Sequence, residues 1–76
     1  MNLPSLRQLQ FLDALARERS FSRAAESMFV TQPTLSTAIR ELEGLLGVQL
    51  VEREARGATL TPIGVEVVTR ARALLS

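Results

Sequence analysis

The chain has 76 residues, 46% of them hydrophobic, and its formal net charge is +1. This length predicts one small domain with a feasible core, and the near-neutral charge excludes a histone-like basic protein. The chain has no Cys and no His, which excludes disulfides, thiolate nucleophiles and the usual zinc ligands. We therefore expect no metal, no cofactor and no enzyme. Without a signal segment or an apolar run of about 20 residues, we expect a soluble cytoplasmic protein.

The first part of the chain predicts two helices separated by a break. Leu recurs every three to four positions over residues 5–17, as in an amphipathic helix. The sequence ERS interrupts this pattern, and Ser20 or Ser22 can cap a short helix over SRAAESM, residues 22–28. A tight turn, FVT, follows this second helix.

A third helix is predicted over residues 32–46, with Thr31 as N-cap, Pro33 in the first turn and Gly47 at its end. One face is an apolar stripe that we assign to the core: Leu35, Ala38, Ile39, Leu42, Leu45 and Leu46. The other face starts with short polar side chains instead of the Glu and Lys that are usual on a merely solvated helix. Such a face favours close contact, edge to edge, with a partner.

The hydrophobic period changes after Gly47. VQLVER predicts a strand, EARG a turn with Gly57 at its tip, and ATLT a return strand. Thr61 and Pro62 then begin a fourth helix as N-cap and first helical residue. A small domain cannot cover the whole apolar stripe of this helix, so we expect part of it to form a dimer seam: Ile63, Val67, Val68, Ala71, Leu74 and Leu75. Because the helix reaches the end of the chain without a cap, we expect the chain to belong to a longer protein.

The order of elements predicts a mainly α fold with a small β-hairpin. Two helices joined by a tight turn make a helix-turn-helix unit, and a hairpin directly after it makes a winged version. We expect the winged helix-turn-helix over residues 1–60 and a linker helix over residues 61–76.

Residues 20–64, SFSRAAESMFVTQPTLSTAIRELEGLLGVQLVEREARGATLTPIG, resemble the N-terminal DNA-binding domain of LysR-type bacterial transcriptional regulators. The resemblance rests on a combination of residues: Phe21, Ala24-Ala25, Gln32-Pro33, Leu35-Ser36, Ile39, Leu42-Glu43, Leu46-Gly47, Leu50, Glu52-Arg53, Leu60-Thr61 and Gly64. It implies sequence-specific binding to double-stranded DNA at a partly palindromic operator. It also implies a homodimer joined through the linker helix, often a tetramer in the full protein, and a small-molecule effector bound by a C-terminal domain that this chain lacks.

A recognition helix presents its first residues to base edges in the major groove. Gln32 can pair with adenine through both ends of its amide, and Pro33 and the Thr34 methyl can contact a thymine methyl. The helix start also favours a nearby phosphate. The predicted contact face also includes Thr31, Ser36, Thr37 and Arg40.

The resemblance adds contacts outside this helix. It implies that Ser22 and Arg23 touch the phosphate backbone, and that Arg53 and Arg56 of the wing contact phosphate or enter the minor groove. Thr37 departs from the family, because many relatives carry Arg or another long side chain there.

Other interpretations of these residues stay open. Thr31 could be only an N-cap, Gln32 and Pro33 only helix-start residues, and Arg23 a solvated side chain. The remaining arginines could pair with carboxylates of the chain: Arg40 with Glu43, and Arg53 or Arg56 with Glu52 or Glu54. The alternative function is a winged-helix module for protein interaction or dimerisation. Acidic residues over positions 32–40 would favour that alternative, and there are none.

Overall fold

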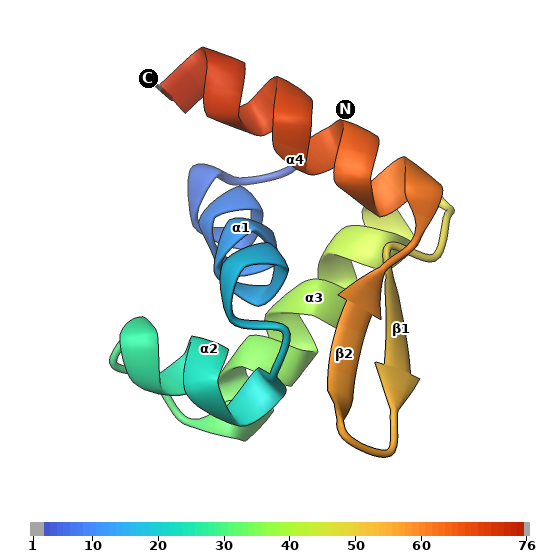
Figure 1. The fold of residues 1–76 in the computed structure, drawn as a ribbon. Helices are drawn as coiled ribbons and strands as arrows, with labels where there is room; N and C mark the ends of the chain where they lie inside the picture. The colour runs from blue at the N-terminus through green and yellow to red at the C-terminus, as the bar shows by residue number, and fades with distance from the viewer. Residues whose placement is uncertain (1–2, 76) are drawn as a thin grey trace.

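The computed structural model describes the backbone of residues 3–75 and the side chains up to Leu74. The elements follow one another as α1 (Leu6–Glu18), α2 (Phe21–Ser27), α3 (Gln32–Leu46), β1 (Val51–Glu54), β2 (Gly57–Leu60) and α4 (Pro62–Leu75). Figure 1 shows α1 in the centre of the molecule, where it packs against α2, α3, β2 and α4. This is the predicted winged helix-turn-helix followed by a further helix.

Side-chain caps set the starts of the first three helices. Ser5 and Gln8 form a capping box, with each side chain bound to the other's backbone N–H. Ser20, and not Ser22, caps α2, because its Oγ accepts a hydrogen bond from Arg23 N at 3.2 Å. Thr31 caps α3 through Thr34 N at 3.3 Å. The third helix therefore has the bounds that its cap and its apolar period predict.

The turn between α2 and α3 contains a feature that the sequence pattern did not indicate. Phe29 adopts a left-handed backbone conformation, with φ of +58°, and its side chain is 94% exposed. Its N–H donates to the carbonyl of Glu26 at 3.1 Å, which closes the turn. A non-glycine residue in this conformation is uncommon.

The hairpin differs from its predicted bounds. β1 begins at Val51, because Leu50 N and Val51 N donate to Glu43 Oε2 at 2.7 and 3.2 Å and hold the preceding residues in a loop. The turn consists of Ala55 and Arg56. The prediction that Gly57 lies at its tip is wrong, because Gly57 is the first residue of β2 and faces Glu54.

Gly57 has a different structural reason to be glycine. Its φ is +143°, and a Cβ atom there would collide with the carbonyl oxygen of Arg19. The neighbouring Ala58 N donates to that same carbonyl at 3.0 Å. This contact fixes the turn end of the hairpin to the end of α1.

The core lies where α1 meets the other elements. Its largest fully buried side chains are aliphatic: Leu12, Leu15, Leu35, Ile39, Leu42 and Leu50. The other residues of the buried cluster are Phe11, Ala14, Phe21, Ala24, Ala25, Val51, Ala58 and Val68. These are mainly the stripes that the helical period predicts, with Leu50 and Val51 supplied by the approach to the hairpin. Among the described residues, no helix has both the length and the apolar character needed to cross a membrane.

Thr61 connects α4 to the loop before the hairpin. Its Oγ1 donates to the carbonyl of Gln49 at 2.7 Å and accepts from Gly64 N at 3.1 Å, which confirms the predicted N-cap. A Cβ atom at Gly64 would collide with the backbone of Leu50. The first turn of α4 therefore packs directly against the backbone of Leu50.

The predicted dimer seam on α4 needs correction. Val68 and Ala71 are each 3% exposed, and Val67 is half-buried against the core. These three side chains face the domain itself, because α4 lies across α1 and β2. Ile63 and Leu74 are exposed, at 39% and 81%, and so is Val65 at 52%, which the predicted set omitted. The predicted contact of the Leu75 side chain lies outside the described part.

Candidate nucleic-acid interface

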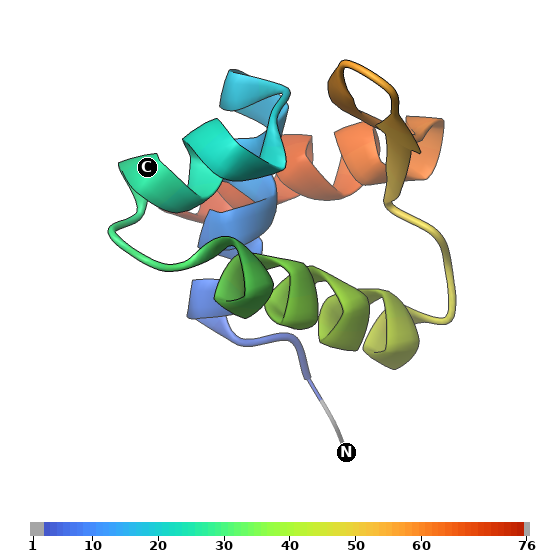
Figure 2. The ribbon, with the colours of Figure 1, turned by 90° about the horizontal axis from the view of Figure 1, so that it is seen from below.

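The first three turns of α3 present the predicted polar face to solvent. Figure 2 shows this helix running across the lower face of the molecule, with α2 and the hairpin on the same side of it. Its outward residues line an open hollow of about 520 Å³: Gln32, Pro33, Ser36, Thr37 and Arg40. All of them are exposed except Ser36, which is half-buried. The structure thus brings together the amide, the hydroxyls and the guanidinium that the sequence assigned to contact with DNA.

The Thr31 hydroxyl is committed to the helix start. It accepts from Thr34 N and lies 2.8 Å from Thr34 Oγ1. Both hydroxyls are exposed, so the pair can still meet a partner, but each already has a hydrogen-bond partner within the chain. The methyl group of Thr34 remains available for apolar contact.

Arg53 is the residue that joins the wing to the helices. It stands on the same face of β1 as buried Val51, since side chains two apart along a strand point the same way. Its Nη2 donates to Ser36 Oγ at 2.6 Å, and its Cζ lies 3.9 Å from the centroid of the Phe21 ring. The Arg53 guanidinium therefore contacts both α2 and α3, while the Arg53 backbone lies in the hairpin.

The anticipated local ion pairs do not form. Glu43 does not pair with Arg40, because its carboxylate accepts the Leu50 and Val51 N–H groups. Arg40 instead places Nη2 3.5 Å from Ser36 Oγ. Among the described residues, no carboxylate lies within 4.0 Å of the charged nitrogens of Arg40, Arg53 or Arg56.

The remaining predicted contacts flank α3. Ser22 is exposed in the first turn of α2. Arg23 is anchored to the end of α1, because its Nη2 donates to the Glu18 carbonyl at 2.7 Å and its Nε lies 3.9 Å from Glu18 Oε1. Arg56 is exposed in the turn of the hairpin. Of the three, only Ser22 lines a hollow of about 280 Å³ between α2, the start of α3 and the hairpin. Its other lining residues are Ser20, Phe21, Gln32, Arg53, Glu54 and Gly57.

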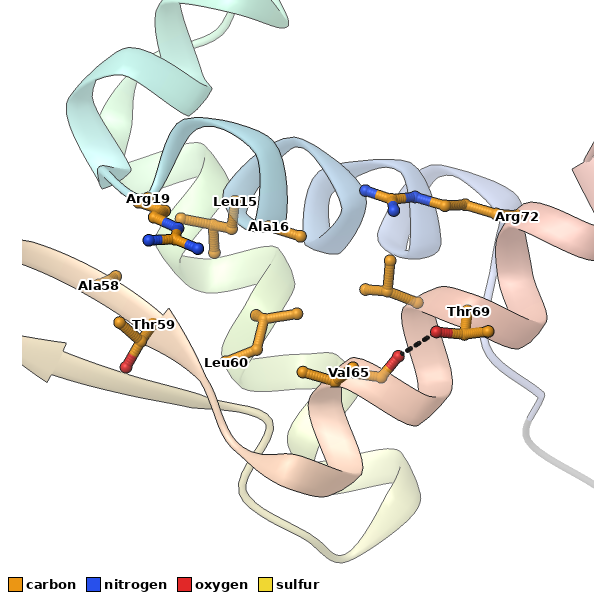
Figure 3. A pocket seen from close by; sticks show the side chains of 10 residues that line it. Leu15, Ala16, Arg19, Ala58, Thr59, Leu60, Val65, Thr69 and Arg72 are labelled. Atoms are coloured by element: carbon orange, nitrogen blue, oxygen red, sulfur yellow. Dashed lines mark hydrogen bonds between the residues drawn. The ribbon is translucent and has the colours of Figure 1, made fainter.

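A separate groove of about 310 Å³ lies between α1, β2 and α4 (Figure 3). Its walls are largely apolar, with Arg19 and Arg72 at its edges. Arg72 Nε already contacts Asp13 Oδ1 at 2.6 Å. None of the predicted DNA-contacting residues lines this groove, so it is not part of the site on α3.

Sequence reasoning missed two positioning residues. Phe21 and Glu43 were assigned no function. The Phe21 ring stacks against the Arg53 guanidinium, and the Glu43 carboxylate accepts a hydrogen bond from the backbone just before the hairpin. No local pattern could have indicated the Arg53–Ser36 contact, because 17 residues separate the partners.

The family model for bacterial regulatory helix-turn-helix proteins of the lysR family matches residues 6–65. This chain belongs to the lysR family. The resemblance expected from the sequence is therefore confirmed. The HTH-type transcriptional regulator EstR of Acinetobacter baylyi is 55% identical over 74 residues, which are 97% of this lysR-family chain and 25% of that protein. The chain thus spans about a quarter of the length of the curated relatives that it matches.

Solved structures with this fold include DNA complexes. BenM_DBD bound to catB site 1 DNA matches with a TM-score of 0.88 and 41% identity, over 93% of this chain and 79% of that one. The CbnR_DBD–DNA complex matches with a TM-score of 0.90 and 37% identity, over 93% and 82%. The winged helix-turn-helix of this lysR-family chain is the fold of domains that have been solved on DNA.

Proposed function

We propose that this chain binds double-stranded DNA at a specific sequence, as the DNA-reading part of a transcription regulator. The observation that carries the proposal is the exposed start of α3, where Gln32, Ser36, Thr37 and Arg40 gather without a carboxylate over positions 32–40. The likeness to BenM_DBD and CbnR_DBD, both solved with DNA, supports it.

The proposed pose puts the start of α3 into the major groove. Gln32 meets a base edge, Pro33 and Thr34 lie against apolar base surface, and the helix start lies near phosphate. The wing approaches the backbone or the minor groove through Arg56 at its turn, while Ser22 and Arg23 meet the backbone from the first turn of α2.

Charge alone does not explain specific binding here. The hairpin carries two arginines, Arg53 and Arg56, and two glutamates, Glu52 and Glu54, so its formal charge is two minus two, or zero. The whole chain carries +1. Non-specific binding depends on phosphate neutralisation, so we expect a modest salt dependence and a large share of the specificity from base contacts.

A homodimer is the proposed binding unit, with residues 1–60 as the winged domain and residues 61–76 as the linker helix. Exposed Ile63 and Leu74, which lie on one face of α4, supply apolar surface for a second copy. Two copies related by a twofold axis would place α3 in successive major grooves, about 34 Å apart for a simple dimer, at a partly palindromic site. A tetramer and a separate effector-binding part belong to the longer protein, which we place in the cytoplasm.

A binding selection tests the proposed function. The 76-residue chain is incubated with a pool of random duplexes at fixed physiological salt, and the bound fraction is sequenced. Enrichment of one sequence, repeated with inverted symmetry, is the expected result. Recovery of the pool without enrichment, by the chain and by two tethered copies alike, would favour a winged-helix interaction module instead.

A further inference from the structure

Two guanidinium groups converge on one hydroxyl in the middle of the recognition face. Arg53 Nη2 is 2.6 Å from Ser36 Oγ, and Arg40 Nη2 approaches the same oxygen at 3.5 Å. The two arginines come from different elements, the hairpin and α3 itself. Ser36 is half-buried, so solvent reaches it only in part.

The Arg53 guanidinium is held in place by its surroundings. It stacks over Phe21, whose ring is anchored in the core with the residue only 7% exposed. On the opposite strand face, Glu54 is engaged by Thr59 Oγ1 at 3.1 Å and does not compete for Arg53. The donor that reaches Ser36 is therefore fixed by packing and not by a flexible ion pair.

A serine hydroxyl has one O–H donor and two acceptor lone pairs. Arginine can only donate. Arg53 takes one acceptor site of the hydroxyl at 2.6 Å, and the Arg40 guanidinium at 3.5 Å places a second positive group beside the same oxygen, so the approach of a third donor is disfavoured. Among the described residues, no carbonyl receives its proton, so that proton is free for a partner outside the chain.

We infer that Arg53 is a positioning residue which biases Ser36 toward donating its hydrogen bond, and so restricts the base that Ser36 reads. This inference rests on the proposed DNA binding. In the major groove, guanine O6, purine N7 and thymine O4 accept hydrogen bonds, whereas cytosine N4 and adenine N6 donate. Ser36 therefore selects an acceptor edge and disfavours a cytosine amino group at the same place.

The test is a double-mutant cycle on the enriched duplex and on duplexes changed at single base pairs. Ser36→Ala should reduce discrimination at one base pair by about threefold to tenfold, the effect of one hydrogen bond. Arg53→Met removes the donor and keeps an apolar stem over Phe21. Arg56→Met is the matched control, because it removes the same charge from the hairpin turn without touching Ser36. Circular dichroism checks that each variant is folded.

In the Arg53→Met background, Ser36→Ala should change discrimination by less than about twofold, and the variant should tolerate cytosine at that base pair. In the Arg56→Met background, the full effect of Ser36→Ala should remain. The role of Arg53 would be overturned if Ser36→Ala had an equal effect in both backgrounds, or if Arg53→Met lost the same affinity for every duplex. Specific binding by the unmodified chain would remain intact in either case. If the unmodified chain prefers no duplex at all, the proposed function fails, and this inference fails with it.

Discussion

At the scale of single residues, Gln32 carries the most direct prediction. Its exposed amide can form two hydrogen bonds with adenine, and no residue of α3 can replace it. Gln32→Ala should cost about 1–3 kcal/mol of binding free energy for the enriched duplex and relax the preference at one base pair. Titration against duplexes with each base at that position measures both effects. A loss that is the same for all four bases would show that Gln32 does not read a base.

Arg56 should behave differently, because it stands in the exposed turn of the wing. Arg56→Gln should weaken all duplexes about equally and lower the salt slope by about one. Arg70→Gln, which removes the same charge from α4 where Arg70 pairs with Glu66 at 3.1 Å, is the control and should leave the slope nearly unchanged. A base-selective loss in Arg56→Gln would contradict its assignment to phosphate.

The sequence predicted which residues share the polar face of α3 better than it predicted their contacts within the chain. Thr31, Gln32 and Ser36 were found because caps and helical period are local properties of the chain. Arg53 and Arg40 were found as charges, but their shared partner Ser36 was not, because side chains from different elements meet only in the folded molecule. The alternative pairing of Arg40 with Glu43 does not form, since the Glu43 carboxylate accepts the N–H group of Leu50 before the hairpin.

At the scale of elements, two contacts made by the backbone of the hairpin and its approach help to hold it against the helices. One of them is the carboxylate of Glu43, which accepts two backbone N–H groups. Glu43→Ala should destabilise the fold by about 1.5–3 kcal/mol, the range for hydrogen bonds to a charged group. Glu41→Ala, an exposed position on the same helix, is the control and should change stability little. Urea denaturation compares the two, and equal effects would contradict the role of Glu43.

The second contact is the close passage of Gly57 past Arg19. Gly57→Ala should destabilise by about 2 kcal/mol or more, since it combines a strained φ with a collision against backbone. Gly44→Ala is the matched substitution in open space, where nothing lies within 4 Å of an added Cβ. It should stabilise by roughly 0.5–1 kcal/mol, as expected inside a helix. Thermal unfolding measures the stability of both variants, and a Gly57→Ala protein as stable as the unmodified chain would contradict the close contact of Gly57 with Arg19.

The elements themselves follow largely from local signals. The cap and apolar stripe predicted α3 at its actual bounds, whereas β1 was placed three residues too early because alternation over VQLVER resembles a strand. The periodicity of α4 correctly predicted an apolar face. It did not predict that this face packs mainly against the domain itself. Val68 and Ala71 contribute to this domain's interior, and helical period cannot tell a core from an interface.

At the scale of the whole molecule, the dimer makes a separate prediction. Leu74 is 81% exposed on α4, so Leu74→Glu should leave the fold intact while weakening self-association. Val48→Glu introduces the same charge at a residue that is 39% exposed in the loop before the hairpin, and it should not affect association. Sedimentation across a concentration series measures the shift. If both variants associate like the unmodified chain, α4 is not the seam.

Sequence-specific binding is the central claim, and a competition titration tests it most directly. The chain is titrated at physiological salt against the enriched duplex and against a scrambled duplex of equal length and composition. If the scrambled duplex loses two base contacts of about 1–3 kcal/mol each, the chain should prefer the enriched duplex by about thirtyfold or more. Equal affinity for the two duplexes would contradict the account.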